Sequence, residues 1–306
     1  MATAFLFTGQ GSQFAGMGRE LAEASSAARE VFAEADEALG EPLSQLCFEG
    51  PDDALALTAN TQPCTLAVSL AAYRALGQQT DFVAGHSLGE YSALTAAGAL
   101  DLSTAIKLVR ERANRMQEAV PAGTGGMVAL RKTDRKEAEE IAAKVTRGIC
   151  DVANLNTPGQ VVLSGETAAM DEVEELVGPR KAVRLQVSVP FHSSLLKKAA
   201  EGFAEVLADV ELRDPAFPVV CNVDAKPLRH SDEIRDALVR QFAGSVRWQE
   251  SVEWMLREGG IDRFVEFGPK PTLTKMTAQI AKAIEVDGFE SFAVCDAEGL
   301  SALQAG

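Results

Sequence analysis

The chain is poor in the residues that mark several protein classes. It has only three histidines, and its five cysteines stand far apart without a C-x-x-C pair. This cysteine usage counts against a thiolate metal site or a disulfide framework and favours free thiols in a reducing compartment. No apolar run approaches the ~18 residues of a membrane span, and the N-terminus lacks the basic region and apolar segment of a signal peptide. We therefore expect a soluble, cytoplasmic protein.

Basic residues are also in the minority. Lys and Arg number 29 against 44 Asp and Glu, which gives a net charge of -15. This surplus of negative charge counts against a general surface for nucleic acid or for an anionic membrane, so an anionic partner has to meet a local basic patch. With 46% apolar and 24% charged residues among 306, the chain has the composition of a globular protein with one large domain or two moderate ones.

The most informative segment runs from residue 82 to 98. A short apolar run leads into Gly85-His86-Ser87-Leu88-Gly89, and an Ala-rich helical stretch follows. This is the strand–turn–helix context of a nucleophile elbow, in which a serine in a strained turn needs neighbours without side chains. The G-x-S-x-G string alone is weak, and a structural turn is the alternative. The context predicts that Ser87 is a nucleophile and that the N–H of Leu88 faces a developing oxyanion.

Residues 101–119 read as an amphipathic helix with one charge on its apolar face. The stripe consists of Ala105, Leu108, Val109, Ala113 and Met116. Arg112 falls within this stripe, and a buried arginine needs an anionic partner because an unpaired buried charge is costly. A structural salt bridge or a snorkelling side chain fits the pattern. A fork that binds a substrate carboxylate is the functional alternative.

The segment 124–188 has its own pattern of elements. Its predicted strands and helices follow the order β-α-β-β-α-β, which is typical of the ferredoxin-like split unit. We therefore expect a small ferredoxin-like domain at 124–188, inserted into a large α/β-hydrolase-like domain formed by 1–123 and 189–306. The strands of the large domain should form a mainly parallel sheet. We expect the last dozen residues to be a loose tail.

The scarcity of histidine makes the search for a general base short. His86 precedes Ser87 on the incoming strand, and adjacent strand residues point to opposite sides. His230 stands in a polar stretch where a surface position is expected. His192 follows a β-branched run at a strand end, where the predicted small domain returns to the large one. By elimination, His192 is the predicted base, which accepts the serine proton as a neutral imidazole.

Six segments, in their order and spacing, resemble one family nearly end to end. The segments are Gly9-Gln10-Gly11-Ser12-Gln13, Gly85–Tyr91, Arg110-Glu111-Arg112, Asn154–Gln160, Val187–Ser193 and Glu266-Phe267-Gly268-Pro269. Together they resemble the malonyl-CoA:acyl carrier protein transacylases. The resemblance implies malonyl-CoA and the phosphopantetheine thiol of an acyl carrier protein as substrates, without a metal or other cofactor.

The resemblance also implies a catalytic role for five residues. Ser87 resembles the acylated serine and His192 its base. The backbone N–H groups of Gln10 and Leu88 match the family's oxyanion hole. Gln241 resembles a glutamine whose backbone carbonyl holds the histidine in place of a triad carboxylate.

Four further residues are implied to contact the acyl group or line its pocket. Arg112 resembles the arginine that pairs with the malonyl carboxylate, which favours the functional alternative above. Asn154 and Asn156 fall in a family motif beside the pocket. Phe191 precedes the histidine, where polyketide acyltransferase domains with Phe take malonyl rather than methylmalonyl. Many carrier-protein-dependent members have Ser there.

The expected reaction is ping-pong transfer of a malonyl group through a serine ester, for fatty-acid biosynthesis. A stand-alone acyltransferase that serves a polyketide synthase is an alternative with the same chemistry. An α/β-hydrolase-like thioesterase would instead release the acyl group to water, and a non-catalytic docking module would do neither.

Carrier proteins are acidic, so docking would need local basic residues. Arg180, Lys181, Lys197 and Lys198 flank the His192 segment and are the candidates, with solvated charges as the alternative. We expect the chain to act as a monomer.

Overall fold

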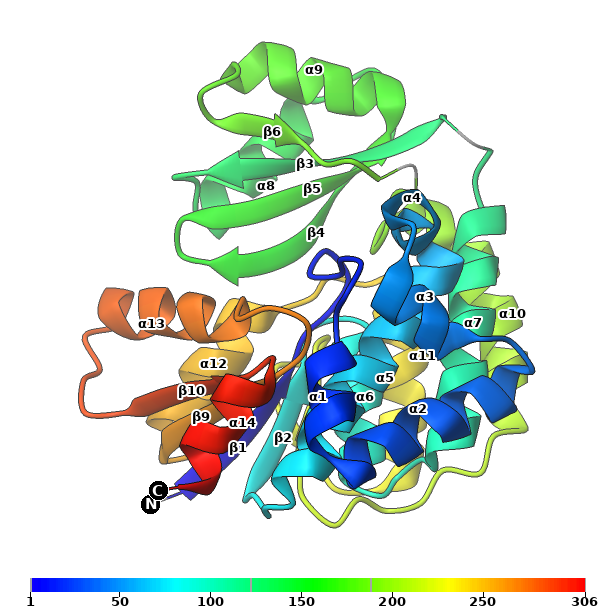
Figure 1. Ribbon diagram of the computed structural model, residues 1–306. Helices are drawn as coiled ribbons and strands as arrows, with labels where there is room; N and C mark the ends of the chain where they lie inside the picture. The colour runs from blue at the N-terminus through cyan, green and yellow to red at the C-terminus, as the bar shows by residue number, and fades with distance from the viewer. Residues whose placement is uncertain (1, 122, 188, 306) are drawn as a thin grey trace.

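Two sheets organise the computed structural model, which describes residues 2–121, 123–187 and 189–305 (Figure 1). The larger sheet has the strand order β10-β9-β1-β2-β7-β8, and the smaller one has the order β4-β5-β3-β6. The strands of the larger sheet are β1 (Ala2–Phe7), β2 (Phe82–Gly85), β7 (Val219–Val220), β8 (Pro227–Leu228), β9 (Ile261–Phe267) and β10 (Glu290–Val294). All its neighbours are parallel except β7 and β8, which confirms a mixed α/β fold with a mainly parallel sheet.

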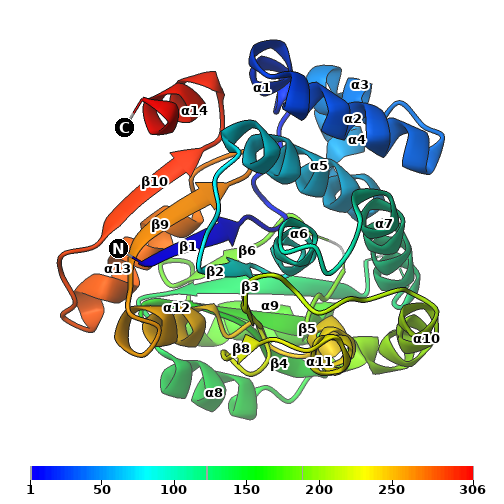
Figure 2. The ribbon, with the colours of Figure 1, turned by 90° about the horizontal axis from the view of Figure 1, so that it is seen from below.

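Helices cover both faces of the larger sheet (Figure 2). The helices before the second sheet are α1 (Arg19–Ala24), α2 (Ser26–Leu39), α3 (Leu43–Glu49), α4 (Asp52–Ala56), α5 (Thr58–Leu76), α6 (Gly89–Ala96) and α7 (Leu102–Glu118). Those after it are α10 (Lys197–Ala208), α11 (Ser231–Ala243), α12 (Trp248–Arg257), α13 (Leu273–Ala283) and α14 (Ala297–Gln304). None of the helices that the structure describes combines the length and apolar character needed to span a bilayer.

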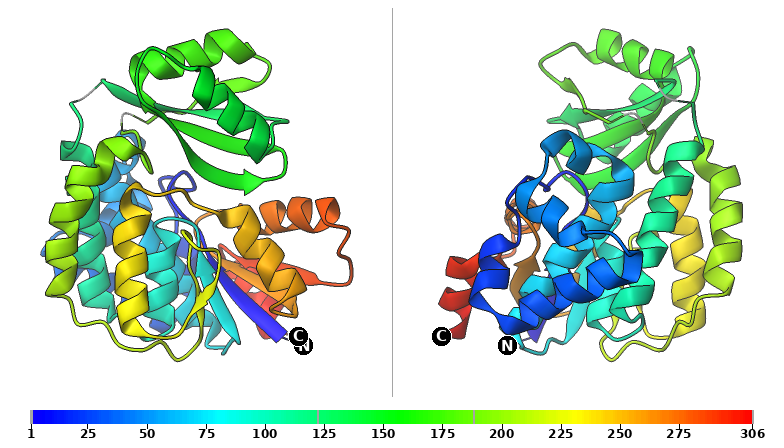
Figure 3. Two further views of the ribbon diagram at one scale, coloured as in Figure 1. Left: turned by 180° about the vertical axis from the view of Figure 1, so that it is seen from behind. Right: turned by 45° about the vertical axis from the view of Figure 1, so that its right-hand side comes forward.

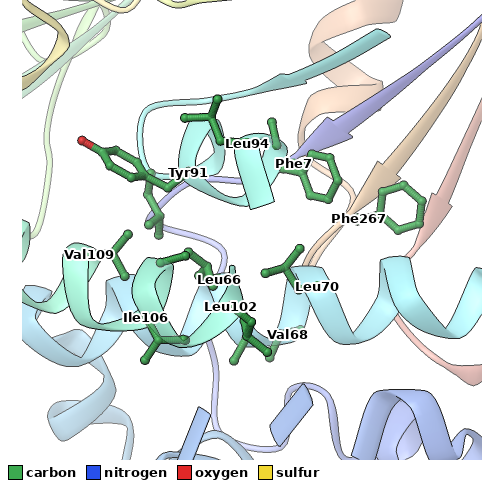
Figure 4. Close-up of a cluster of buried hydrophobic side chains, with 14 of the residues drawn as sticks. Phe7, Leu66, Val68, Leu70, Tyr91, Leu94, Leu102, Ile106, Val109 and Phe267 are labelled. Carbon is green, nitrogen blue, oxygen red and sulfur yellow. The ribbon is translucent and has the colours of Figure 1, made fainter. Parts of the chain in front are cut away.

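The central strand β1 is buried on both sides. Phe5 and Phe7 point into the larger core with α5, α6 and α7, whereas Ala4 and Leu6 point into a second core with α12 and α13. This is the alternation of a strand covered on both faces. Figure 4 shows Phe7 and Phe267 on neighbouring strands beside Leu70 of α5. The core therefore fixes the ends of β1 and β2, from which the site is built.

The second sheet is antiparallel and has its own core (Figure 3). Its elements are β3 (Gly125–Arg131), α8 (Arg135–Lys144), β4 (Cys150–Thr157), β5 (Gln160–Glu166), α9 (Thr167–Val177) and β6 (Ala182–Arg184). They follow one another in the expected chain order. Ser188, the predicted end of a small domain, lies outside the described residues, and the domain division stays a prediction.

The C-terminal segment differs from its prediction. Residues 297–304 form α14 rather than a loose tail. The side chain of Asp296 accepts a hydrogen bond from the N–H of Gly299 at 2.8 Å, and Leu300 and Leu303 are buried. Buried leucines one turn apart and a capping carboxylate explain why this short segment is helical.

The turn between β2 and α6 is compact because two glycines leave room for the backbone. A Cβ added at Gly85 would lie 1.9 Å from the carbonyl oxygen of Gly89, and one added at Gly89 would lie 2.0 Å from that of Phe7. Between them, Ser87 has a left-handed backbone with φ of 52°. The predicted need for residues without side chains on both sides of the serine thus has a direct steric cause.

Replacing Gly89 by alanine tests this packing. Gly89→Ala puts a methyl group against the Phe7 carbonyl, and we expect the free energy of unfolding to fall by about 2–3 kcal/mol, as at an overpacked core site. Gly159→Ala is the control, because the nearest atom to its added Cβ is Lys132 Cα at 4.0 Å. Urea unfolding measures both variants. Wild-type stability of Gly89→Ala would contradict the steric account.

Candidate active site

A cavity of about 440 Å³ opens where the carboxyl ends of β1 and β2 face the second sheet. Ligands commonly bind at this edge of a parallel sheet. The predicted residues that line it are Gln10, Ser87, Leu88, Arg112, Asn154, Asn156, Phe191 and His192. In the part of the chain that the structure describes, no group of three or more His, Cys, Asp or Glu side chains could hold a metal ion.

Ser87 and His192 meet although 105 positions separate them. Ser87 stands at the elbow between β2 and α6, and His192 stands in the loop that returns from the second sheet before α10. The Oγ of Ser87 lies 2.7 Å from Nε2 of His192. This distance is within reach of direct proton transfer.

The surroundings of His192 fix its tautomer. Its Nδ1 lies 3.1 Å from the backbone carbonyl oxygen of Gln241 and 3.0 Å from that of Gly244. Because carbonyl oxygens only accept hydrogen bonds, Nδ1 carries the proton and Nε2 is left to accept from Ser87. Burial lowers the pKa of His192 to about 3, and the positive charge of Arg112 adds to this effect. The ring is therefore neutral at pH 7.

The imidazole rings of the other two histidines have partners other than Ser87. The Nε2 of His86 lies 2.9 Å from Oδ1 of Asn156, on the second sheet. His230 has a side chain that is 70% exposed, with Nδ1 at 3.4 Å from a carboxylate oxygen of Asp214. The structure thus brings the predicted base, and neither alternative, to the serine.

Arg112 extends from α7 into the base of the cavity and is only 1% exposed. Its Nη1 donates to Oε1 of Gln62 at 2.8 Å, and its Nη2 donates to Oε1 of Gln241 at 3.0 Å and to Oγ of Ser87 at 3.2 Å. Its guanidinium also lies over the ring of Tyr91, with the carbon 5.3 Å from the ring centre. Burial lowers its pKa.

These contacts bear on the two structural explanations for Arg112. A snorkelling side chain would carry its charge to solvent, but this guanidinium is enclosed. A structural salt bridge would need a carboxylate, but among residues 2–121, 123–187 and 189–305 none forms an ion pair with Arg112. The guanidinium therefore faces the cavity with neutral acceptors around it and can pair with an anionic ligand.

Gln10 and Leu88, whose backbone N–H groups are the predicted oxyanion donors, both line the cavity. Neither donates a hydrogen bond to another described residue. The side chain of Gln10 is held separately, because its Oε1 accepts from the hydroxyl of Thr58 at 2.9 Å. Two free backbone donors beside the serine are what an oxyanion requires.

Two amide side chains hold the elbow from behind, through contacts that were not predicted from the sequence. Oδ1 of Asn222 accepts from the N–H of Ser87, and its Nδ2 donates to the carbonyl of Gly85, both at 2.7 Å. Nε2 of Gln241 donates to the carbonyl of Ser87 at 2.9 Å. Asn222 follows a two-residue strand and lies outside every motif, so only its amide side chain could have drawn attention to it.

The part of the cavity wall that the second sheet supplies contains a small apolar cluster. Phe191 packs with a small cluster of buried residues on the second sheet that includes Met127 and Val162. Asn154 and Asn156 are each 7% exposed, and Nδ2 of Asn156 donates to Oε1 of Gln160 at 3.1 Å. These predicted pocket residues therefore share one wall.

The four predicted docking residues lie outside this cavity. Arg180, Lys197 and Lys198 are exposed. Lys181 instead forms an ion pair with Glu137, with Nζ at 2.8 Å from the carboxylate. Among the described residues, Lys181 is thus the one of the four cations that forms an ion pair.

A family profile described as "Acyl transferase domain" matches residues 4–296. The chain belongs to the acyl transferase family. The resemblance of its six segments to the malonyl-CoA:acyl carrier protein transacylases is confirmed, because relatives of the chain carry that name.

Three relatives of the acyl transferase show how far the likeness extends. A "Malonyl CoA-acyl carrier protein transacylase" from Bacillus subtilis (strain 168) is 43% identical over 290 residues, 92% of this chain and 91% of that one. The crystal structure of an acyl-carrier-protein-S-malonyltransferase from Bartonella henselae matches with a TM-score of 0.93 at 43% identity, over 99% of this chain and 98% of that one. A malonyl-transacylase solved in complex with a type II polyketide acyl-carrier protein matches with a TM-score of 0.93 at 40% identity, over 100% of this chain and 99% of that one.

The depressed pKa of His192 predicts a pH dependence for the stability of the acyl transferase. Between pH 6.5 and about 3, the unfolded chain takes up a proton that the folded chain refuses, so stability is lost as the pH falls. We expect the free energy of unfolding to fall by about 2 kcal/mol more in the wild type than in His192→Gln between pH 7 and pH 5, because the variant lacks this titration. Urea unfolding at the two pH values measures the difference. An equal loss in both proteins would show that His192 is not held neutral.

Proposed function

We propose that the protein transfers a malonyl group from malonyl-CoA to the phosphopantetheine thiol of an acyl carrier protein. The observation that carries this proposal is one cavity in which Ser87 Oγ lies 2.7 Å from His192 and 3.2 Å from Arg112. The first distance fits a nucleophile with its base. The second places a cation within the length of a short dicarboxylic acyl group.

In the first half-reaction, the hydroxyl of Ser87 attacks the thioester carbon while Nε2 of His192 takes its proton. The carbonyl oxygen becomes an oxyanion that the N–H groups of Gln10 and Leu88 can bind. When the tetrahedral intermediate collapses, the carbon–sulfur bond breaks, and His192 returns the proton to the departing CoA thiolate. The products are a malonyl-serine ester and free CoA.

The second half-reaction uses the same groups in the opposite direction. His192 takes the proton from the phosphopantetheine thiol, whose sulfur attacks the serine ester. The same backbone donors bind the second oxyanion, and the proton passes to the Oγ of Ser87 as the ester bond breaks. The malonyl group leaves on the carrier protein, and the serine is restored.

Arg112 gives the site its preference for an acyl group that carries a carboxylate. A guanidinium fork binds the two oxygens of a carboxylate through parallel hydrogen bonds. An acetyl group offers no such partner and leaves the buried cation uncompensated. The free acid end of malonyl thus supplies both orientation and selection.

The finer organisation of the fold belongs to the same proposal. The second sheet with α8 and α9 is a small ferredoxin-like domain at 124–188, inserted into a large α/β-hydrolase-like domain formed by 1–123 and 189–306. The chain order of its elements and its separate core support this division. We further propose that the protein is a cytoplasmic monomer to which an acyl carrier protein docks through Arg180, Lys181, Lys197 and Lys198.

Two pathways can use this chemistry. Fatty-acid biosynthesis is the one we propose, because relatives such as the 43% identical protein from Bacillus subtilis are named acyl carrier protein transacylases. A solved neighbour that binds a polyketide carrier protein favours polyketide synthesis as the second candidate. Malonyl transfer from the protein to purified carrier proteins of each kind separates the two.

Intact-mass measurement tests the reaction directly. On mixing with malonyl-CoA, the protein should gain one malonyl group, and adding phosphopantetheinylated carrier protein should move that mass to the carrier. Ser87→Ala is the control and should gain nothing, because it lacks the attacking oxygen. Release of the group as free malonate would favour a thioesterase. Absence of any adduct on the wild type would contradict both malonyl transfer and hydrolysis through a serine ester.

A further inference from the structure

A buried carboxyl lies directly behind the nucleophile and takes no part in the steps above. Glu90 stands in the first turn of α6 and is 2% exposed. One of its oxygens, Oε2, accepts from the backbone N–H of Asn222 and from Nε2 of Gln241, both at 3.0 Å. Burying a carboxylate costs free energy unless hydrogen bonds compensate the charge, so the two donors that bind Glu90 indicate what it does.

Glu90 binds the two residues whose side chains hold the elbow, Gln241 through that same side chain and Asn222 through its backbone N–H. Through the bonds described above, Asn222 binds the carbonyl of Gly85 and the N–H of Ser87, and Gln241 binds the carbonyl of Ser87. Three backbone groups of the turn are thus held by the side chains of two residues, and both residues donate to one oxygen of Glu90, Asn222 from its backbone N–H and Gln241 from Nε2. We call Glu90, Asn222 and Gln241 the amide clamp.

The elbow needs such support because its backbone is strained. A non-glycine residue in the left-handed region costs about 1–3 kcal/mol and persists only where the surroundings over-determine it. Ser87, with φ of 52°, is such a residue. Loosening the clamp would let the serine relax away from His192 without unfolding the protein.

The clamp also orients the amide of Gln241. Its Nε2 faces two groups that only accept, the carbonyl of Ser87 and the carboxylate of Glu90, which turns Oε1 toward Nη2 of Arg112 at 3.0 Å. Glu90 therefore also places the acceptor that steadies the guanidinium. It supplies a negative charge one amide away from that cation.

We propose that Glu90 is a positioning residue: as a carboxylate it sets the amide clamp, which holds Ser87 in its strained conformation and turns Gln241 toward Arg112. The inference rests on the proposed malonyl transfer, because its readout is acylation of Ser87. Protonation of Glu90 weakens two charge-assisted hydrogen bonds and so loosens the clamp.

The charged and titratable groups around Glu90 make this protonation accessible. Burial raises its pKa to about 7, and the positive charge of Arg112 on α7 opposes this shift while Asp224 after β7 adds to it. The negative charge of Glu90 also contributes to raising the pKa values of Cys221 and Tyr91, but both values lie far above neutrality because these groups are buried. Titration of the site near pH 7 is therefore that of Glu90.

Single-turnover acylation by malonyl-pantetheine, which lacks the phosphates of CoA, tests the proposal between pH 5.5 and 8.5. The wild-type rate should fall as the pH drops through 7. Glu90→Gln, which mimics the protonated form, should show a flat profile about ten-fold below the wild type at pH 8 and equal to it near pH 5.5. Glu90→Met, whose uncharged thioether is only a weak acceptor, should react about 10²-fold more slowly than the wild type at pH 8 and show no rise with pH, as expected for a displaced nucleophile.

Glu205→Gln makes the same chemical change at an exposed position and should behave as the wild type. A wild-type pH profile in Glu90→Gln, or a wild-type rate in Glu90→Met, would overturn the proposal. If Glu90→Met fails to fold in urea-unfolding controls, the profile of Glu90→Gln alone decides. If the wild type itself forms no malonyl ester, the proposed function fails instead.

Discussion

The site depends on the guanidinium of Arg112, which is enclosed and has no carboxylate partner among the residues that the structure describes. The hydrogen-bond acceptors around Arg112 are the oxygens of Gln62, Ser87 and Gln241, all of them neutral. Removing a cation from water costs several kcal/mol, and neutral acceptors return only part of that. The free enzyme therefore holds an unpaired positive charge next to its nucleophile. An acyl group with a carboxylate end completes this arrangement, which joins substrate selection to the reacting centre.

The catalytic pair is held by neutral groups for the same reason. Two backbone carbonyls orient His192 where a carboxylate could have served, so no anion beside the base competes for Arg112. The buried carboxyl of Glu90 is kept one amide away and acts through Gln241. Negative charge is thus absent from the place that the malonyl carboxylate must take. Helices α6, α7 and α11 and the loop before α10 bring these groups together at the carboxyl ends of β1 and β2.

Local patterns predicted much of the site. The flanking glycines indicated the elbow at Ser87, the shortage of histidine left His192 as the base, and helical periodicity turned Arg112 inward. The partner of Arg112 could not be predicted, because it depends on which residues α5 and α11 bring across the core. Asn222 contacts the elbow across 135 positions, and no local pattern records such a contact.

The central claim is that Arg112 selects the carboxylate of the acyl group, and paired loading assays with malonyl-CoA and acetyl-CoA test it most directly. The account predicts that Arg112→Ala loses malonyl loading by about 10²–10³-fold, the equivalent of several kcal/mol, and gains acetyl loading relative to malonyl. Arg115→Ala, on the same helix but paired with Glu111, should keep the wild-type preference. An unchanged malonyl-to-acetyl ratio in Arg112→Ala would contradict the account.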